Sequence, residues 1–411
     1  MPKTIPVAEV VYRPDLYPRF KPDPATIQEY AQNLEALPPI ELSQQKILID
    51  GYHRLKAHET AGATEIPYTE TQVESEAHIH LLATARNAKH GLRISEDEKK
   101  SLAIKWWQNR PDAEIEDALS ISHRQFLAWT SKKREELEAV QKREVYARWM
   151  RCETQEAIAE AVGVPQQTVT RWIADFTQND ADGDSGIFRD FAPELYALWS
   201  FGKADGEVKH FGNLPTGVID NLLYYYTKPF DVVFDPFGGS GSTIDQCLAR
   251  KRRHYVSDLN PIPARSDIRK HDITAGLPKD LPVPDLVFLD PPYWKQAEGR
   301  YSKDKTDLAN CDLEAFLATV GEIAKAVKRK WTAEHSGRLA LIMGPWKDGG
   351  KYLDLPFLCY ERIGKYLDLK QRVIVPYSTQ VHGGAYVEQA KKRKEILYLT
   401  RDLMVFERPA E

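Results

Sequence analysis

The pattern of apolar and polar residues changes most clearly near residue 180. Beyond that point, short apolar runs of strand character, such as "DVVFD", "HYVSD", "DLVFLD", "LALIMG" and "LMVFER", alternate with amphipathic stretches of helical period, such as "LEAFLATVGEIAKAV". This alternation is typical of a parallel or mixed sheet flanked by helices. The carboxyl half is therefore predicted to form an α/β domain.

The amino half shows a different pattern. It begins with short strand-like runs and an amphipathic helix, and then becomes helical throughout until a polar, glycine-bearing stretch, "QNDADGDSG", that has no periodicity. We expect a small α+β domain at 1–92, an all-α domain at 93–177, a linker at 178–186 and the α/β domain at 187–411.

Composition limits the possible function classes. A chain of 411 residues fits two or three domains, and its formal charge of -4 leaves nucleic-acid binding to local basic faces such as "KRR" at 251–253 or "KKRK" at 391–394. The four cysteines lie far apart without zinc spacing, so we expect neither a metal site nor disulfides. With no long apolar window and no signal-peptide core, the sequence predicts a cytoplasmic protein that does not enter a membrane.

A glycine-rich loop follows the first strong strand of the carboxyl half, in "DVVFDPFGGSGSTIDQCLAR". The strand ends at Asp235, and a ligand in such a sheet binds beyond the carboxyl ends of the strands. The next strand ends at Asp258, at the spacing at which dinucleotide folds hold ribose hydroxyls, so NAD is one alternative. The third glycine of the dinucleotide motif is missing, which favours an adenosine cofactor without phosphate. The residues that form the tight turn and open the helix after it are Gly238, Gly239, Gly241 and Ser242.

The segment "DPPYW" ends a later apolar strand. An exocyclic amino group on a base is a poor nucleophile, because its lone pair is delocalised into the ring. The Asp290 carboxylate and the backbone carbonyl after Pro291 can accept hydrogen bonds from the two amino hydrogens and free that lone pair to attack a methyl group. Pro291 and Pro292 stiffen the backbone, and Tyr293 offers a flat face for an extruded base.

With these motifs in this order, residues 187–411 resemble the amino-group DNA methyltransferases. "DPFGGSGS", which includes Phe237, resembles their S-adenosylmethionine loop, and "RDLMVF" at 401–406 resembles their closing strand. Asn213 and Pro215 lie in a segment similar to the one that covers the methionine part of the cofactor, and Asp272 lies where the family approaches the adenine. The resemblance implies S-adenosylmethionine as cofactor and a seven-stranded Rossmann-like methyltransferase sheet, parallel except for one late reversed strand.

The residue before Pro-Pro bears on the target. In the family, Asp at this position leans towards adenine N6 and Ser towards cytosine N4, so Asp290 favours adenine, with N4-cytosine as the alternative. Methylation of cytosine C5 needs a cysteine thiolate, usually in Pro-Cys, and no cysteine here follows a proline.

Two of the candidate residues have a second interpretation. Asp272 could instead be the cap of the turn after it. Arg300, in a polar loop after the catalytic strand, is a candidate DNA contact or simply surface.

Residues 154–173, "TQEAIAEAVGVPQQTVTRWI", fit a helix-turn-helix with Gly163 in the turn. In the major groove, glutamine can form paired hydrogen bonds with adenine, and arginine can hydrogen-bond to guanine or to a phosphate. A helical hairpin that only packs is the alternative. The side chains that the second helix presents outward are Gln166, Gln167, Thr168, Thr170 and Arg171.

Further upstream, "ILIDGYHRLKAHETAG" runs from a strand through a glycine turn into a helix, with His53 and Arg54 at a helix start suited to phosphate. Residues 4–175 resemble the ParB amino-terminal domain and the helix-turn-helix domain that follows it. ParB proteins carry Gly-Glu-Arg-Arg at this turn, whereas this chain has Gly51, Tyr52, His53 and Arg54. The departure argues against nucleotide hydrolysis and implies a domain for DNA docking or dimerisation.

The sequence therefore predicts a site-specific adenine-N6 methyltransferase that acts on double-stranded DNA, with a homodimer compatible with its ParB-like part. Two alternatives stay open. One is a non-enzymatic ParB-like DNA-binding protein whose carboxyl domain senses the cofactor. The other is methylation of RNA or of a protein amide, which uses similar Pro-Pro-aromatic motifs.

Overall fold

The computed structural model describes residues 3–17, 23–89, 95–178, 186–201, 214–295, 307–348, 351–377 and 383–410. Contacts divide the chain into two compact units, 1–140 and 141–411. The division falls inside one long helix, α6 (His123–Met150), so the helix-turn-helix lies in the second unit, whereas the sequence grouped it with the other helices from residue 93 onward. Among the described residues, no helix combines the length and the apolar character needed to cross a membrane.

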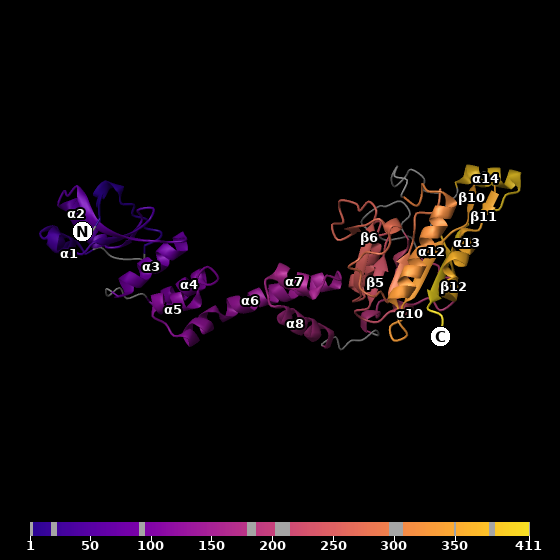
Figure 1. Cartoon of the computed structure of the whole chain (residues 1–411), viewed down its shortest axis with the longest axis horizontal. Helices are drawn as coiled ribbons and strands as arrows, with labels where there is room; N and C mark the ends of the chain where they lie inside the picture. The colour runs from indigo at the N-terminus through magenta and orange to yellow at the C-terminus, as the bar shows by residue number, and fades with distance from the viewer. Residues whose placement is uncertain are drawn as a thin grey trace. The chain divides into compact units, whose positions relative to one another are not determined.

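The first unit contains a small α+β domain followed by helices, as predicted (Figure 1). Its four strands lie in the order β1-β4-β2-β3, and the core beneath them includes Ile40, Leu42 and Leu55. The strands are β1 (Lys3–Pro6), β2 (Ile40–Ser43), β3 (Leu48–Asp50) and β4 (Glu65–Thr71). The helices are α1 (Pro24–Ala31), α2 (Tyr52–Thr60), α3 (Glu76–Lys89), α4 (Glu96–Trp106) and α5 (Asp112–Leu119), with two short 3-10 turns, η1 (Val7–Glu9) and η2 (Leu34–Ala36).

The glycine turn before α2 is built from contacts within the fold. Gly51 has φ 104°, and a Cβ there would lie 2.7 Å from the Ile40 side chain. The Arg54 guanidinium donates hydrogen bonds of 2.6 Å to the Pro39 carbonyl and to the Asp50 carboxylate. The Arg54 guanidinium therefore holds this turn together, and phosphate binding at this helix start stays a prediction.

The helix-turn-helix forms as the sequence predicts. Helix α7 (Gln155–Val162) ends at Gly163, whose φ of 72° makes the turn, and α8 (Gln166–Gln178) follows. Ile158, Val169 and Trp172 are buried in one cluster with residues from the end of α6. The two helices thus share a core with the last turns of α6.

The second unit is built around a seven-stranded sheet of order β12-β13-β9-β8-β5-β6-β7. Strand β13 pairs antiparallel with both neighbours, and the other pairings are parallel, which confirms the expected methyltransferase sheet. The strands are β5 (Val232–Asp235), β6 (Arg253–Asp258), β7 (Arg269–Lys270), β8 (Leu286–Leu289), β9 (Arg338–Met343), β12 (Asp368–Pro376) and β13 (Thr400–Glu407).

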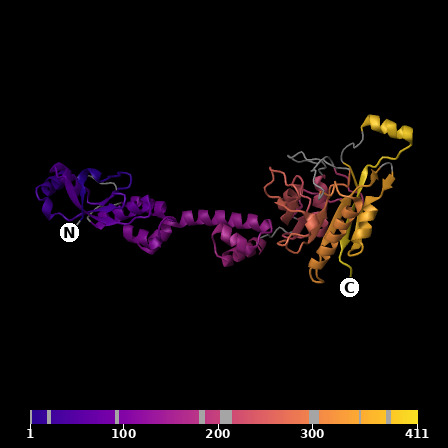
Figure 2. The same cartoon turned by 45° about the horizontal axis from the view of Figure 1, so that its top comes forward.

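Helices cover both faces of this sheet (Figures 1 and 2). Along β8, Val287 and Leu289 pack in one hydrophobic cluster, while Leu286 and Phe288 pack in the other. When both faces of a strand are buried, every residue along it is apolar, and this explains the uninterrupted apolar sequence "LVFL" of β8. The first cluster includes residues of α12 (Leu313–Lys330) and α13 (Leu355–Ile363), and the second includes residues of α10 (Thr216–Tyr226) and α11 (Ser242–Ala249). Smaller elements are η3 (Ile273–Ala275), a hairpin of β10 (Trp346–Asp348) and β11 (Lys351–Leu353), and α14 (Gly384–Arg393).

Candidate active site

The glycine loop after β5 requires glycine at two positions. A Cβ on Gly238 would lie 2.7 Å from the Val256 side chain, because the loop passes close against β6. Gly241 has φ 85° and begins α11, a backbone conformation that other residues rarely adopt. The loop is therefore shaped so that its backbone faces the space beyond the strand ends.

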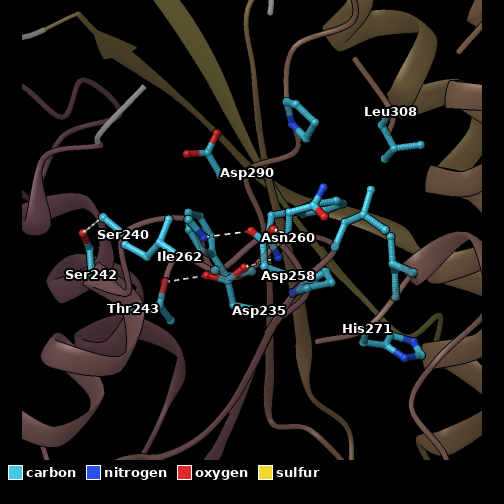
Figure 3. A pocket seen from close by; sticks show the side chains of 18 of the residues that line it. Asp235, Ser240, Ser242, Thr243, Asp258, Asn260, Ile262, His271, Asp290 and Leu308 are labelled. Atoms are coloured by element: carbon cyan, nitrogen blue, oxygen red, sulfur yellow. Dashed lines mark hydrogen bonds between the residues drawn. The ribbon is translucent and has the colours of Figure 1, made fainter. Parts of the chain in front are cut away.

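Asp235, the last residue of β5, holds this loop in place through hydrogen bonds. Its carboxylate accepts hydrogen bonds from the Phe237 backbone N–H at 2.8 Å and from the Thr243 hydroxyl at 2.6 Å (Figure 3). The residue is 3% exposed, and burial raises the pKa of its carboxyl to about 7, with a further contribution from the Asp290 charge. Asp235 thus fixes the loop and carries a proton more readily than an ordinary aspartate.

Asp258, the last residue of β6, lies across the loop. One carboxylate oxygen accepts a hydrogen bond of 3.0 Å from the Gly239 N–H, and the other accepts one of 2.9 Å from the Asn260 N–H. A carboxylate offers about four acceptor sites. Asp258 can therefore hold the loop and still accept hydrogen bonds from the hydroxyls of a ligand in the pocket.

A pocket of about 280 Å³ lies at this edge of the sheet and brings most of the predicted residues together (Figure 3). The predicted residues that line it are Asp235, Phe237, Gly238, Gly239, Ser242, Asp258, Asp272, Asp290 and Pro292. The loop residue Gly241 is not in the lining, and neither are Pro215, Pro291 and Tyr293. Asn213 and Arg300 lie outside the described residues. The residues that sequence reasoning missed are Leu214, Ile219, Pro236, Ser240, Thr243, Leu259, Asn260, Ile262, His271, Ile273, Phe288, Asp307 and Leu308.

Asp272 has the capping role that was one of the two interpretations made from the sequence. Its carboxylate accepts hydrogen bonds from the Thr274 N–H at 2.9 Å and from the Thr274 hydroxyl at 2.7 Å, so it caps the short helix η3. The same residue lines the pocket. The cap fixes the carboxylate at the pocket wall.

Asp290 directly follows β8 and lies partly exposed in the same pocket (Figure 3). Burial raises the pKa of its carboxyl to about 6, while the positive charge of Arg401 and a hydrogen bond with Tyr293 act in the opposite direction. Near neutral pH the group is therefore mostly ionised, and it can accept hydrogen bonds from an amino group.

Tyr293 takes a different place from the one that the sequence suggests. Its side chain packs against the hydrophobic cluster of α12, and its hydroxyl interacts with Asp290 and Arg401. Burial and the Asp290 charge raise the pKa of this hydroxyl well above its ordinary value. Trp294 is a core residue, 4% exposed, whose indole N–H donates a hydrogen bond of 2.8 Å to the Cys311 carbonyl.

Arg401 is a further site residue that the sequence analysis did not identify. It lies near the start of β13, is 5% exposed, and places its guanidinium carbon 4.7 Å from the centre of the Tyr377 ring. Its pKa is raised by the neighbouring Tyr293 and Asp290, against the effect of burial. The only signal in the sequence was an arginine at the head of the closing strand.

Comparisons with known proteins agree with this geometry. A model of the N6/N4 family, described as DNA methylase, matches residues 87–262, a stretch that contains the glycine loop and Asp258 but ends before Asp290. The matched residues make up less than half of the chain. The type II methyltransferase M.Cfr9I of Citrobacter freundii is 35% identical over 78 residues, 19% of this chain and 25% of the relative. The chain thus spans a quarter of that relative's length.

Two solved structures are similar to parts of the chain. TrmN from Thermus thermophilus shows 18% identity over 48% of this chain and 50% of its own, with a TM-score of 0.32. The chromosome-partitioning protein ParB from Caulobacter crescentus, complexed to the centromeric parS site, shows 15% identity over 31% of this chain and 69% of its own, with a TM-score of 0.25.

The lining of the methylase pocket fits S-adenosylmethionine, the methyl donor of this family. Its charged residues are carboxylates, and no lysine or arginine is among the residues that line it. Such a surface attracts the positive sulfonium and ammonium groups of this cofactor and disfavours the pyrophosphate of NAD. We expect Asp258 to accept hydrogen bonds from the ribose hydroxyls of such a cofactor. No group of metal-ligating side chains occurs among the described residues.

The predicted DNA-contacting residues lie on α8. Gln166, Gln167, Thr170 and Arg171 are exposed and Thr168 is partly exposed, so the structure presents this face outward. The Gln166 amide donates a hydrogen bond of 2.7 Å to Glu156, and the Thr170 hydroxyl donates one of 2.6 Å to Gln155. Gln167 and Arg171 are therefore the better candidates for contacts to DNA.

Contacts with the sheet hold the end of α6 and, through it, the helix-turn-helix. The Trp149 ring lies 5.3 Å from the Phe230 ring, and Cys152 is buried in the same cluster as β5 and β8. Phe230 lies two residues before the start of β5, and Arg253, which also contacts Trp149, is the first residue of β6. These anchors lie at the amino ends of the strands, whereas the pocket lies at their carboxyl ends.

Proposed function

We propose that this protein is an S-adenosylmethionine-dependent methyltransferase that modifies the N6 amino group of adenine in double-stranded DNA. The observation that carries the proposal is that Asp290 and Pro292 line the same pocket as Gly238 and Asp258. An acceptor for an amino group thus lies beside a site suited to a methyl donor.

The chemistry follows from the residues around Asp290. The amino group of the base donates one hydrogen bond to the Asp290 carboxylate and one to the backbone carbonyl after Pro291, which localises its lone pair. The bound cofactor supplies an electrophilic methyl group. Once the nitrogen–methyl bond has formed, the nitrogen carries one proton too many, and a carboxylate with a pKa of about 6 can accept that proton and pass it to water.

A base within a duplex cannot reach the end of a buried strand. The target nucleotide must be flipped out of the stack, which costs a few kcal/mol and is offset by stacking and hydrogen bonds in the pocket. Since Tyr293 is engaged with Asp290 and Arg401, we assign it the role of fixing the Asp290 carboxylate.

The helix-turn-helix supplies DNA recognition in this proposal. Its exposed face carries Gln167 and Arg171. The glutamine side chain can pair with adenine, and the arginine side chain can bind guanine or a phosphate. Its anchorage to the sheet through Trp149 keeps the recognition helix attached to the methylase domain. Binding of the duplex by α8 would therefore raise the local concentration of target bases near the pocket.

One experiment tests the proposal and its alternatives together. The protein is incubated with duplex DNA and S-adenosylmethionine that carries an isotope-labelled methyl group, and the nucleosides are then analysed by mass spectrometry. Labelled N6-methyladenine is expected. Labelled N4-methylcytosine would contradict the choice of adenine, and cofactor binding without any labelled nucleoside would indicate a sensor instead of an enzyme.

Asp290→Ala is the matched variant for this experiment. We expect it to abolish methyl transfer while leaving the binding of cofactor and DNA close to that of the wild type, because Asp290 holds neither the glycine loop nor α8. A fully active Asp290→Ala protein would refute the role assigned to this carboxylate.

A further inference from the structure

The connection between β12 and β13 is much longer than its geometry requires. Pro376 at the end of β12 pairs with Thr400 at the start of β13 in antiparallel register. Two strands paired in this way are commonly joined by about two to five residues. Here the chain between them runs from 377 to 399 and carries a helix of its own, α14. The extra length is an insertion that the sheet does not need.

The insertion leaves the sheet at the edge that holds the active site. Asp402 pairs with Met343 at the end of β9, and Leu341 of β9 pairs with Leu289, the residue before Asp290. Strand ends that pair in this way lie side by side. Figure 2 shows α14 standing away from the body of the sheet. The helix therefore projects from the same side of the domain as the pocket.

The surface of the insertion is unlike that of a helix that supports a core. Ala390 is the single buried residue among 383–399, while Tyr386 is 49% and Ile396 76% exposed. A helix that is exposed on most sides contributes little to the packing of its own domain. Where the chain returns towards β13, Tyr398 stacks on Tyr352 of β11 at 5.4 Å, which fixes the base of the insertion.

Basic residues are concentrated at the end of α14. Lys391, Lys392, Arg393 and Lys394 are consecutive and exposed, and Glu388 and Glu395 are the only acidic residues among 383–399. Lys391 pairs with Glu388 at 2.7 Å, which leaves Lys392 and Arg393 as the principal positive charges of the helix itself. A cationic cluster at the same edge of the sheet as an acidic pocket is suited to a polyanionic partner.

We propose that α14 and the residues up to 399 form a second DNA-binding element, which holds the phosphate backbone next to the flipped base. The inference rests on the proposed function and deepens it. The helix-turn-helix is anchored at the amino ends of the strands, so a duplex positioned for catalysis needs a separate contact at the carboxyl ends. Lys392 and Arg393 supply that contact by neutralising phosphates.

The test compares two double variants that lose the same charge at opposite edges of the sheet. Lys392→Ala with Arg393→Ala removes the proposed contact. Lys328→Ala with Arg329→Ala, in the last turn of α12, is the matched control, because that turn precedes the amino end of β9. Steady-state methylation of duplex DNA is measured for both at several salt concentrations, together with cofactor binding and the melting temperature.

We expect the α14 variant to raise the KM for DNA about tenfold and to lower the slope of log affinity against log salt by roughly 2. Its kcat at saturating DNA, cofactor binding and melting temperature should match the wild type, and the α12 control should match in every respect. Equal effects of the two variants, or no effect of either, would overturn the inference. A change in sedimentation instead of KM would overturn it as well, since it would assign α14 to contact between copies of the chain.

A second variant makes the result independent of the choice of side chains. Residues 378–398 are replaced by Asn-Gly, a two-residue turn that closes the antiparallel pair of Tyr377 and Leu399. We expect a folded protein that binds cofactor normally and whose methylation of duplex DNA falls by at least about tenfold at low DNA concentration. Wild-type levels of methylation would overturn the inference. A wild-type protein that methylates no DNA would instead refute the proposed function.

Discussion

Arg253, the first residue of β6, holds Trp149 of α6 through two contacts. Its guanidinium carbon lies 4.8 Å from the centre of the indole ring, and its Nε donates a hydrogen bond of 3.2 Å to the Trp149 carbonyl. The side chain thus joins the helix that leads into the helix-turn-helix to the amino end of the central sheet. The sheet consequently carries the helix-turn-helix at one edge and the pocket at the other.

Replacement of Arg253 by Ala should loosen this junction without unfolding either part. Loss of a cation–π contact and one hydrogen bond costs about 1–2 kcal/mol. We expect faster amide hydrogen exchange in residues 145–152 and unchanged exchange within α7 and α8. Arg134→Ala is a suitable control, because it removes a comparable contact with Trp107, 5.1 Å away, in the first unit. Unchanged exchange in residues 145–152 would show that Arg253 does not secure the junction.

Asp258 should be required for cofactor binding. A hydrogen bond to a charged group contributes about 1.5–3 kcal/mol, so Asp258→Ala is expected to weaken S-adenosylhomocysteine binding roughly 10- to 100-fold. Asp258→Asn should have a smaller effect, because its amide oxygen can still accept from the Gly239 N–H. Isothermal titration calorimetry measures both. Wild-type affinity in Asp258→Ala would contradict the assignment of this residue to the ribose.

Local signals in the sequence predicted much of this site. Gly163 marks a helix end with positive φ, and Asp235, Asp258 and Asp290 terminate apolar runs that had to be parallel strands. Carboxyl ends of parallel strands meet at one edge, so the three carboxylates could be brought together from sequence order alone. The pocket in the structure confirms that they share a lining.

Other features depend on long-range geometry that no local pattern encodes. Arg401 approaches Asp290 only because β13 runs antiparallel beside β9, and nothing near either residue in the sequence indicates this. The compact units divide inside α6 because the helix continues without a break through residue 140, whereas a change in composition was expected to mark the boundary. The engagement of Arg54 by the carbonyls of Pro38 and Pro39 likewise becomes visible only once the strands are in place.

Arg401 should set the acidic limit of activity through Asp290. Two groups bear directly on this carboxylate: Tyr293, which follows β8, and Arg401, near the start of β13. The charge of Asp235, at the end of β5, is coupled to it. Burial raises the pKa of Asp290 to about 6, and the Arg401 charge works against that rise. Loss of the charge therefore raises the pKa further. Because the ionised form accepts the amino hydrogens, kcat falls as pH drops through this pKa.

We expect Arg401→Gln to move the acidic limb of the kcat profile to higher pH and Arg401→Lys to restore most of the wild-type profile. The KM for cofactor should change little, since Arg401 does not line the pocket. A uniform loss of kcat at every pH, with no shift of the limb, would show that Arg401 has only a structural role.

Asp235 should make the stability of the methylase domain depend on pH. Its folded pKa of about 7 lies above the ordinary value near 3.9, so between these values the folded state binds a proton that the unfolded chain does not. The free energy of unfolding therefore decreases as pH rises from about 4 to about 7. Asp235→Asn removes this titration and can still accept the hydrogen bond from the Phe237 N–H.

Urea unfolding of the cofactor-free protein at pH 5 and pH 8 measures the effect. We expect the wild type to lose about 1–3 kcal/mol more than Asp235→Asn over that interval. The difference between the two proteins isolates Asp235, because every other titrating group is common to both. Parallel pH profiles for the wild type and Asp235→Asn would mean that the loop carboxylate stays ionised in the folded protein.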